Sequence, residues 1–256
     1  MLKKRLQNSE EDFGKTDKNM PTHVNLAKIP RALSPRKFMK KDLEAAVELH
    51  SQVPPNWYYQ SLKKDILQRF WHKRRFEEVS KVIEPTNGKI LDIGCADGMF
   101  SKVIYDKSGA DKLIGIDVLK SSLKWANKHW KKNSRMEFRL GDAHNLEYPS
   151  KSFSAVFALE ILEHVQRPKD VLKEVGRILK KRGYAVFLVP SDSFLFRTIW
   201  YLWLHFYPRG WVWRDTHIQT FRNSYLPKIC KEVGFEVEIN KKFILGMLHL
   251  VKVRKV

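Results

Sequence analysis

From residue 89 onward, short apolar runs alternate with segments in which apolar residues recur at helical spacing. The apolar runs are typical of strands and cover residues 89–94, 113–118, 136–142, 153–159 and 184–190. Helical segments begin near Met99 and Ser121, and a third is opened by Pro168 and closed by Gly183. This alternation predicts a doubly wound, mostly parallel α/β sheet with helices on both faces.

Further elements precede and follow this alternating region. Residues 61–84 carry apolar side chains at helical spacing until Pro85 and Gly88 interrupt the pattern, so a helix leads into the first strand. Residues 226–235 predict a helix that ends at Gly234. Residues 236–240 and 243–253 are close enough to pair as an antiparallel hairpin. We therefore expect a seven-stranded sheet with an antiparallel C-terminal edge.

The first strand runs into a glycine-spaced turn, ILDIGCADGMFS, at residues 90–101. Gly94 and Gly98 let the backbone turn tightly and approach a ligand, and the helix that follows offers free N–H groups. A nicotinamide-binding fingerprint would place glycine at positions 94, 96 and 99, whereas this chain has Ala96 and Met99. The turn predicts a ligand site and disfavours a nicotinamide cofactor.

An acidic residue stands at the end of each of the first three strands: Asp92, Asp117 and Asp142. In open α/β sheets the ligand lies beyond the carboxyl ends of the strands. Carboxylates there accept hydrogen bonds from an ammonium group, ribose hydroxyls or an adenine amine, and they repel phosphates. A single such acid could merely cap the next helix, but three in register favour a nucleoside ligand that carries positive charge.

At this point the chain resembles the class I S-adenosylmethionine-dependent methyltransferases, in particular the branch of the ubiquinone-biosynthesis O- and C-methyltransferases. The resemblance covers residues 70–193 well and residues 217–256 loosely. It rests on the motifs ILDIGCADG, GIDV, GDAHNLEYPSKSFSAVFALEILEHV and FLVPS. It implies a Rossmann-like methyltransferase fold that binds S-adenosylmethionine.

The resemblance also assigns cofactor contacts to residues of this chain. It implies that Asp92, Gly94 and Gly98 line the methionine end of the cofactor, together with Ala96, where many members of the family have glycine. The remaining contacts that it implies are Asp117 with Val118 at the ribose, Asp142 with Ala143 at the adenine, and Ala158 to Glu160 beside the methyl group.

With this assignment the chain divides into five parts. We expect a basic, partly disordered extension over residues 1–60, a lid helix over 61–88 and the cofactor-binding core over 89–193. An aromatic insertion follows over 194–216, and residues 217–256 complete the core sheet.

Polar groups that could act on an acceptor follow the fourth strand in the stretch ALEILEHV. Methyl transfer is an in-line displacement, so holding donor and acceptor in line can supply roughly 7–11 kcal/mol and a base is optional. For a hydroxyl acceptor, His164 or the distant His217 could take the proton, with Glu160 beside them. In an alternative interpretation, these side chains only order the loop.

A metal site is a second hypothesis for the same region. Glu160, Glu163, His164 and His217 offer two carboxylates and two imidazoles, a set that suits a divalent ion. Similar glutamate–histidine sets bind metal in the small-RNA 2′-O-methyltransferases and in some quinone O-methyltransferases. The sequence does not show whether His217 lies close enough to the other three residues to share an ion with them.

The formal net charge of +20 raises the alternative of an RNA substrate. The densest basic cluster, Lys124, Lys128, Lys131, Lys132 and Arg135, is also typical of a solvated helix face. The Asn-Pro-Pro-aromatic motif of base-methylating enzymes is absent after the fourth strand. A small or lipid-like acceptor is therefore favoured over RNA. A non-catalytic scaffold is a further alternative, disfavoured by the intact acids and glycine turn.

Residues 194–213, FLFRTIWYLWLHFYPRGWVW, hold four of the eight tryptophans. The apolar part before Pro208 is 14 residues long, short of the roughly 20 that span a bilayer. Two interpretations remain open: a roof over the active site, and an interfacial segment on an anionic membrane. Upstream, Arg74 or Arg75 could pair with the cofactor carboxylate.

Cysteine usage indicates the compartment. Cys95 and Cys230 follow neither a disulfide framework nor a metal-ligand spacing, which favours a reducing compartment. The charged first 19 residues do not resemble a secretory signal. We therefore expect a cytoplasmic protein, with peripheral membrane contact as the open alternative.

Overall fold

The computed structural model describes residues 44–48, 50–207, 216–222 and 224–256. All of them belong to one compact unit, residues 36–256. Residues 1–43 of the expected N-terminal extension lie outside the described residues, and so do Trp211 and Trp213 of the aromatic insertion.

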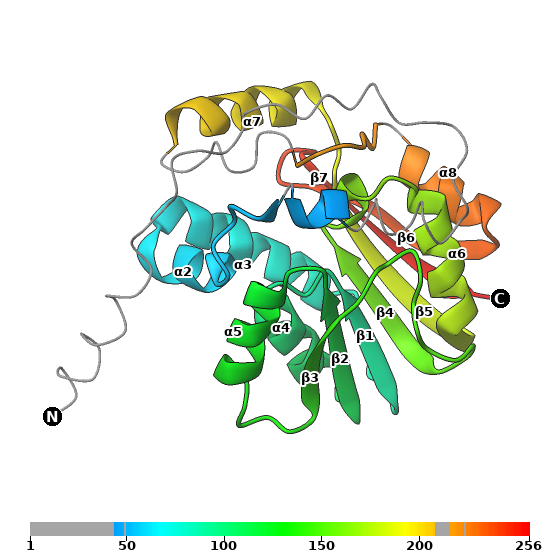
Figure 1. Cartoon of the computed structure of the whole chain (residues 1–256). Helices are drawn as coiled ribbons and strands as arrows, with labels where there is room; N and C mark the ends of the chain where they lie inside the picture. Colours follow the sequence, from blue (N-terminus) through cyan, green and yellow to red (C-terminus); the bar gives the residue numbers. More distant parts are fainter. Residues whose placement is uncertain (1–43, 49, 208–215, 223) are drawn as a thin grey trace, which may run out of the picture. The chain divides into compact units, whose positions relative to one another are not determined.

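In the described part of the chain, seven strands form one sheet in the order β3-β2-β1-β4-β5-β7-β6 (Figure 1). The first five in this order pair in parallel, while β7 is antiparallel to both β5 and β6. The predicted seven-stranded sheet with an antiparallel C-terminal edge is therefore confirmed. The strands are β1 (Lys89–Ile93), β2 (Lys112–Asp117), β3 (Met136–Leu140), β4 (Phe153–Leu159), β5 (Leu179–Pro190), β6 (Phe235–Phe243) and β7 (Leu248–Lys255).

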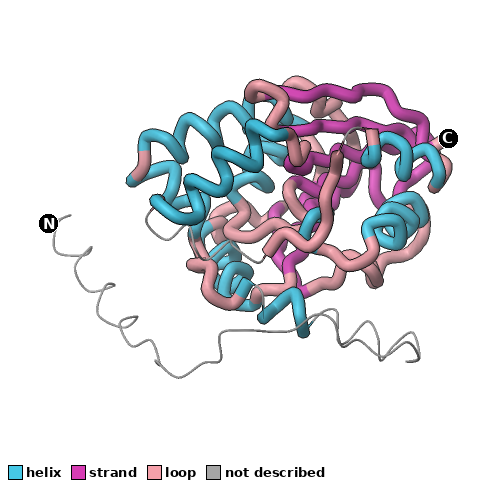
Figure 2. The backbone as a smooth tube through the Cα atoms, turned by 90° about the horizontal axis from the view of Figure 1, so that it is seen from above, coloured by secondary structure: helices cyan, strands magenta, loops and turns pink. Residues whose placement is uncertain are grey.

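Helices cover both faces of the sheet, as the view from above shows (Figure 2). Successive residues of a strand point to opposite faces, so Val156 joins one buried cluster and Phe157 the other. The cluster around Val156 includes apolar side chains of α6 (Pro168–Ile178) and α8 (Tyr225–Glu232). The cluster around Phe157 includes those of α3 (Ile66–Ser80), α4 (Met99–Ser108) and α5 (Lys120–His129).

The helix predicted over residues 61–84 is two helices, so that prediction was wrong in its continuity. α2 (Trp57–Lys64) ends at Asp65, whose backbone is extended, with φ −133° and ψ 121°. The Asp65 carboxylate accepts a hydrogen bond from the N–H of Gln68 at 2.8 Å and so caps the start of α3. The apolar spacing continues across the break and conceals it.

The helix predicted from Pro168 to Gly183 is shorter than expected. α6 ends at Ile178, and β5 begins at Leu179. Leu179 is fully buried and pairs with Phe153 of β4, so burial in the sheet overrides the helical spacing of this residue. The exposed residues Lys180 to Arg182 continue the strand instead of the helix.

The basic cluster on and after α5 faces solvent. Leu123 is buried, whereas Lys124 and Lys128 on the same helix are exposed, as are Lys131, Lys132 and Arg135 after it. The prediction of a solvated basic face is confirmed. Both cysteines are buried and unpaired, as expected.

Candidate functional site

The glycine-spaced turn links β1 to α4 in a left-handed conformation. Gly94, Ala96 and Gly98 have positive φ angles of 74°, 45° and 76°. A Cβ added to Gly98 would lie 2.7 Å from the rings of Phe138 and Trp130, so only glycine fits there. Ala96 adopts the same conformation despite its Cβ, and its N–H donates to Asp117 Oδ2 at 2.9 Å. The turn is therefore tied to the end of β2.

The three acids at the strand ends have different environments. Asp92 is 2% exposed and accepts a hydrogen bond from Ser101 Oγ at 2.6 Å, and burial raises its pKa to about 7. Asp117 accepts hydrogen bonds from the N–H groups of Ala96 and Leu119, and burial raises its pKa as well. For Asp142, burial acts to raise the pKa, but two hydrogen bonds from His144 outweigh it and the pKa is lowered.

A cavity of about 530 Å³ opens beside the glycine turn. Its floor includes Gly94, Ala96, Asp117, Val118 and Glu160. Its walls include residues of α2 and α3, the segment after β4, α7 (Phe194–Phe206), and the turn between β6 and β7. His50 and His217 also line it. Segments far apart in the sequence therefore enclose one site at one edge of the sheet.

A second cavity of about 60 Å³ adjoins the first and shares His50, Val118, Ile161 and His164 with it. Asp142 and Ala143 line this smaller cavity. The other residues predicted to contact the cofactor lie either in the wall of the large cavity or in the interior of the protein. Asp92, Gly98 and Ala158 line neither cavity and lie behind the surface that Gly94, Ala96 and Asp117 present.

Of the two candidate arginines, only Arg75 lies in the cavity wall. It is 3% exposed, forms an ion pair with Glu160, and contacts His72 Nδ1 through Nη1 at 3.1 Å. Burial and the Arg75 charge hold the pKa of His72 well below its usual value. Arg74 is 40% exposed and pairs with Glu77 and Glu78, as a surface arginine does.

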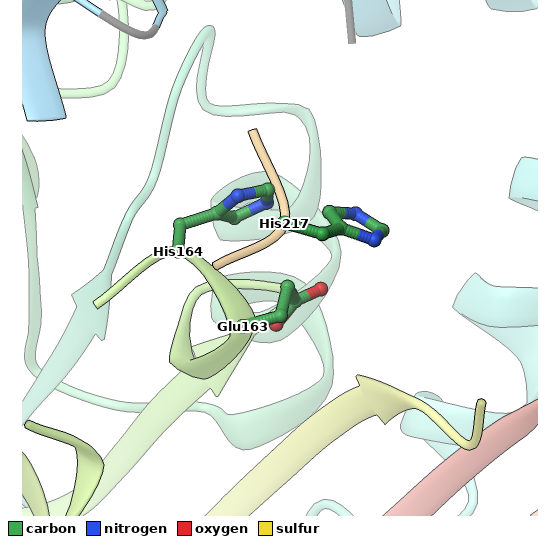
Figure 3. Close-up of side chains that lie close together, drawn as sticks. All are labelled: Glu163, His164 and His217. Carbon is green, nitrogen blue, oxygen red and sulfur yellow. The ribbon is translucent and has the colours of Figure 1, made fainter. Parts of the chain in front are cut away.

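Three members of the four-residue metal hypothesis come together, as Figure 3 shows for Glu163, His164 and His217. One ligand atom from each lies within 4.8 Å of the others. Glu160 is paired with Arg75 instead. The N–H groups of Ile218 and Gln219 both donate to the backbone oxygen of Glu163, at 2.9 and 3.0 Å, and this places His217 beside the other two.

The cluster is buried and electrostatically unusual. Glu163 is 1% exposed, and neither of its carboxylate oxygens has a hydrogen-bond partner among the described residues. Burial, with Glu160 adding to it, raises the pKa of Glu163 well above its usual value. Burial lowers the pKa of His164 well below its usual value and that of His217 to about 4. A buried acid without a partner beside two neutral imidazoles is a site that a cation would stabilise.

The hydrogen bond of His164 sets which nitrogen is free. Its Nδ1 lies 2.7 Å from the backbone oxygen of Thr216, so Nδ1 carries the proton and Nε2 keeps its lone pair. A metal-binding histidine usually donates its second nitrogen to a carbonyl or carboxylate in this way. The donor set of one carboxylate and two imidazoles therefore fits a divalent transition ion.

Within the aromatic insertion, residues 194–206 form α7, a helix with two distinct apolar stripes. Phe196, Trp200, Trp203 and Tyr207 recur at helical spacing and line the cavity. Trp200 stacks on His217 with ring centroids 4.8 Å apart. Leu195, Ile199, Leu202 and Phe206 form the neighbouring stripe and are exposed. Among the described residues, no helix combines the length and the apolar character that crossing a bilayer demands.

Sequence reasoning missed several residues of the site. His50 lines both cavities, and its ring lies 4.7 Å from that of His164. Tyr58 and His72 contact each other at 5.1 Å between ring centroids and surround Arg75. An isolated histidine in a charged segment carries no signal, because only the tertiary structure brings His50 to the strand ends. Tyr58 and His72 lie in the aromatic and basic stretches before the core, and that composition was the available signal.

Comparison with known proteins agrees with this geometry. A family model described as a methyltransferase domain matches residues 58–239. A demethylmenaquinone methyltransferase of Thermotoga maritima is 27% identical over 207 residues, covering 71% of this chain and 86% of that protein. A ubiquinone biosynthesis O-methyltransferase of Pelagibacter ubique is 35% identical over 98 residues. That match covers 38% of this chain and 40% of the relative, so it leaves more than half of each unmatched.

Solved structures show the same fold. The PH0226 protein of Pyrococcus horikoshii superimposes with a TM-score of 0.62 at 19% identity, over 82% of this chain and 99% of that one. An S-adenosylmethionine-dependent methyltransferase of Mesorhizobium loti gives a TM-score of 0.55 at 18% identity, over 69% of this chain and 96% of that one.

The sheet order, the glycine turn and the acids at the strand ends define a class I S-adenosylmethionine-dependent methyltransferase. The chain belongs to the methyltransferase-domain family and resembles its ubiquinone-biosynthesis branch. Membership of this family implies S-adenosylmethionine as the cofactor. The site described above fits that group, because Asp117 and a turn with little side-chain bulk border a cavity of sufficient size.

Proposed function

We propose that this methyltransferase transfers a methyl group from S-adenosylmethionine to the oxygen or carbon of a small, lipid-like acceptor. The observation that carries the proposal is the cavity of about 530 Å³, which joins the glycine turn and Asp117 to a wall of aromatic and aliphatic side chains. The names of the relatives support it, because demethylmenaquinone and ubiquinone precursors are apolar ring compounds with polar oxygens.

The cofactor is proposed to lie across both cavities. Asp117 would accept hydrogen bonds from the ribose hydroxyls, and Asp142 with Ala143 would border the adenine in the smaller cavity. Gly94 and Ala96 would lie beside the methionine end, where Arg75 offers a guanidinium group to the carboxylate. Asp92 and Gly98, which lie behind the wall, would support the shape of the turn.

The acceptor is proposed to lie between α7 and the segment after β4. S-adenosylmethionine supplies an electrophilic methyl group there, and the protein has to hold the acceptor in line with it and exclude water. Trp200 and Trp203 provide flat apolar surfaces for a ring. Trp203 Nε1 is buried without a hydrogen-bond partner among the described residues, so its N–H can donate to an acceptor oxygen.

His217, in the cavity wall, is proposed to accept the proton of a hydroxyl acceptor, with His164 and Glu163 beside it. The same three side chains are proposed to hold a divalent ion that would lower the pKa of that hydroxyl. The partnerless carboxylate of Glu163 supports this second role. Either role favours O-methylation, whereas a carbon acceptor needs only positioning.

We expect the purified, chelator-treated protein to bind Zn²⁺ or Co²⁺ at one site, because one carboxylate and two imidazoles suit these ions. Calorimetry and the visible spectrum of the Co²⁺ form would measure this binding. His164→Ala should abolish it, while His205→Ala, which removes an exposed imidazole on α7, should leave it unchanged. If the folded protein binds neither ion, the metal proposal is refuted, and His217 remains the proposed proton acceptor.

The acceptor class is tested with labelled S-adenosylmethionine supplied with a lipid extract, total RNA or a metabolite extract. We expect label in the organic-soluble fraction, because the cavity wall is mostly apolar. RNA is the second candidate, supported by the exposed basic side chains of α5. Incorporation into RNA alone would reverse this order. Cofactor binding without transfer to any fraction would favour the non-catalytic scaffold.

A further inference from the structure

Exposed apolar side chains gather around the mouth of the large cavity. Ten of the fourteen large apolar side chains exposed in the described part of the chain lie on α3, α7 or the β6–β7 turn. Leu67, Ile199 and Leu245 each line the cavity and are also 74%, 42% and 84% exposed, so they mark its opening. We call the surface formed by Ile66, Leu67 and Phe70 of α3, Phe194, Ile199 and Phe206 of α7, and Leu245 the apolar rim.

Contacts within the fold bring the parts of the apolar rim together. Tyr207, directly after α7, donates a hydrogen bond to the Asp65 carboxylate at the start of α3. Leu245 lines the same opening from the β6–β7 turn. Ile66, Phe194 and Phe206 are 80%, 87% and 78% exposed, so the fold itself leaves these large apolar side chains mostly uncovered. α7 therefore has a second, exposed apolar stripe beside the one that lines the cavity, which a surface helix does not have unless a further surface covers it.

The charges beside the apolar rim are almost all positive. Residues 57–75 carry four exposed cations, Lys63, Lys64, Arg69 and Lys73, and one acid, Asp65. Residues 193–207 contain the exposed Arg197 and no acid. Residues 241–252 contain two exposed lysines, Lys241 and Lys242, and no acid. A surface that must meet anionic lipid headgroups combines apolar and aromatic side chains with surrounding cations in this manner.

We propose that the apolar rim docks on an anionic lipid bilayer and sets the mouth of the cavity against the membrane. The inference rests on the proposed lipid-like acceptor, which would then enter the cavity between α3 and α7 without crossing water. It involves three segments of the fold, of which the aromatic insertion is one. The exposed stripe of α7 lies in the headgroup region, and Lys63, Lys64 and Arg197 meet the lipid charge.

The test is sedimentation of the full chain with vesicles of phosphatidylcholine containing a minority of phosphatidylglycerol. We expect binding to these vesicles at low salt, weaker binding at high salt, and little binding to pure phosphatidylcholine. The triple variant Ile66→Ser/Phe194→Ser/Phe206→Ser should weaken binding by about tenfold or more, because it removes apolar area from two segments of the rim. These three residues line neither cavity.

The matched control is Leu140→Ser/Val256→Ser, which removes exposed apolar side chains from β3 and the C-terminus, outside the apolar rim. This variant should sediment like the wild type. Both variants should retain the wild-type affinity for S-adenosylmethionine by calorimetry. If the wild type does not bind S-adenosylmethionine, the proposed function is refuted. If it binds S-adenosylmethionine but does not sediment with the vesicles, only the membrane proposal is refuted.

Two other occupants of the apolar rim have their own outcomes. In the first outcome, the wild type does not bind vesicles, and sedimentation velocity shows a dimer that the triple variant abolishes. The apolar rim is then an interface between two copies, and the membrane proposal is wrong. Equal sedimentation of the triple variant and the wild type would also overturn it, since binding would then depend on charge elsewhere in the chain.

Discussion

Replacing Asp117 by alanine is expected to weaken S-adenosylmethionine binding roughly 10- to 150-fold, the equivalent of about 1.5–3 kcal/mol for a hydrogen bond to a charged group. The carboxylate lies in the cavity wall and is the group proposed to accept from the ribose hydroxyls. It also accepts hydrogen bonds from the N–H groups of Ala96 and Leu119, so its loss loosens the glycine turn as well. Calorimetric titration measures the affinity.

The control for this variant is Asp106→Ala, which removes a half-exposed carboxylate on α4 that pairs only with Lys102 among the described side chains. Its cofactor affinity should equal that of the wild type. Thermal unfolding of both variants separates a local loss of ligand contacts from a general loss of fold. Wild-type affinity in Asp117→Ala would contradict the assignment of this edge of the sheet as the cofactor site.

Arg75→Met is expected to lower the free energy of unfolding by about 3–5 kcal/mol, because it leaves a buried carboxylate without its partner. Arg75 is 3% exposed and Glu160 is 16% exposed in their ion pair. The arginine also packs over the ring of Phe100 at 5.2 Å. Denaturant unfolding followed by circular dichroism measures the change. Arg74→Met, which removes an arginine that is 40% exposed, should cost less than about 1 kcal/mol.

A second substitution separates the structural role of Arg75 from its proposed role at the cofactor. Arg75→Met/Glu160→Met removes both charges and should recover most of the lost stability, because no unpaired carboxylate remains at this position. Its affinity for S-adenosylmethionine should stay low, since the proposed partner of the cofactor carboxylate is gone. Recovery of that affinity would show that Arg75 only holds Glu160.

Much of the fold could be predicted from the sequence because its signals are local. The apolar runs that became β1, β2, β4 and the second half of β5 are mostly buried on both sides, and the glycines at 94 and 98 have the left-handed backbone that their positions suggested. The hairpin of β6 and β7 was also predicted, since two short strands close in sequence pair readily. The predicted end of a helix was wrong where one residue fitted both a helical and a strand pattern, as Leu179 did.

The candidate site could be predicted only in part. Asp117 and Asp142 follow strands whose ends meet at one edge, so their proximity to the cavities follows from parallel topology. The metal hypothesis grouped Glu160 with Glu163, but the backbone of Glu160 adopts a positive φ of 57° and its side chain pairs with Arg75. That contact depends on how α3 packs across the sheet, and no local spacing encodes it.

The sequence by itself determined the order of strands and helices, the glycine turn and the acids at its edge, because each depends on periodicity or on a backbone conformation that few residues tolerate. Only the tertiary structure decided the rest. It brought His217 to Glu163 through backbone hydrogen bonds, placed Trp200 over His217, and left the neighbouring apolar stripe of α7 exposed. These contacts join residues far apart in the chain, so their energy depends on packing that no single segment contains.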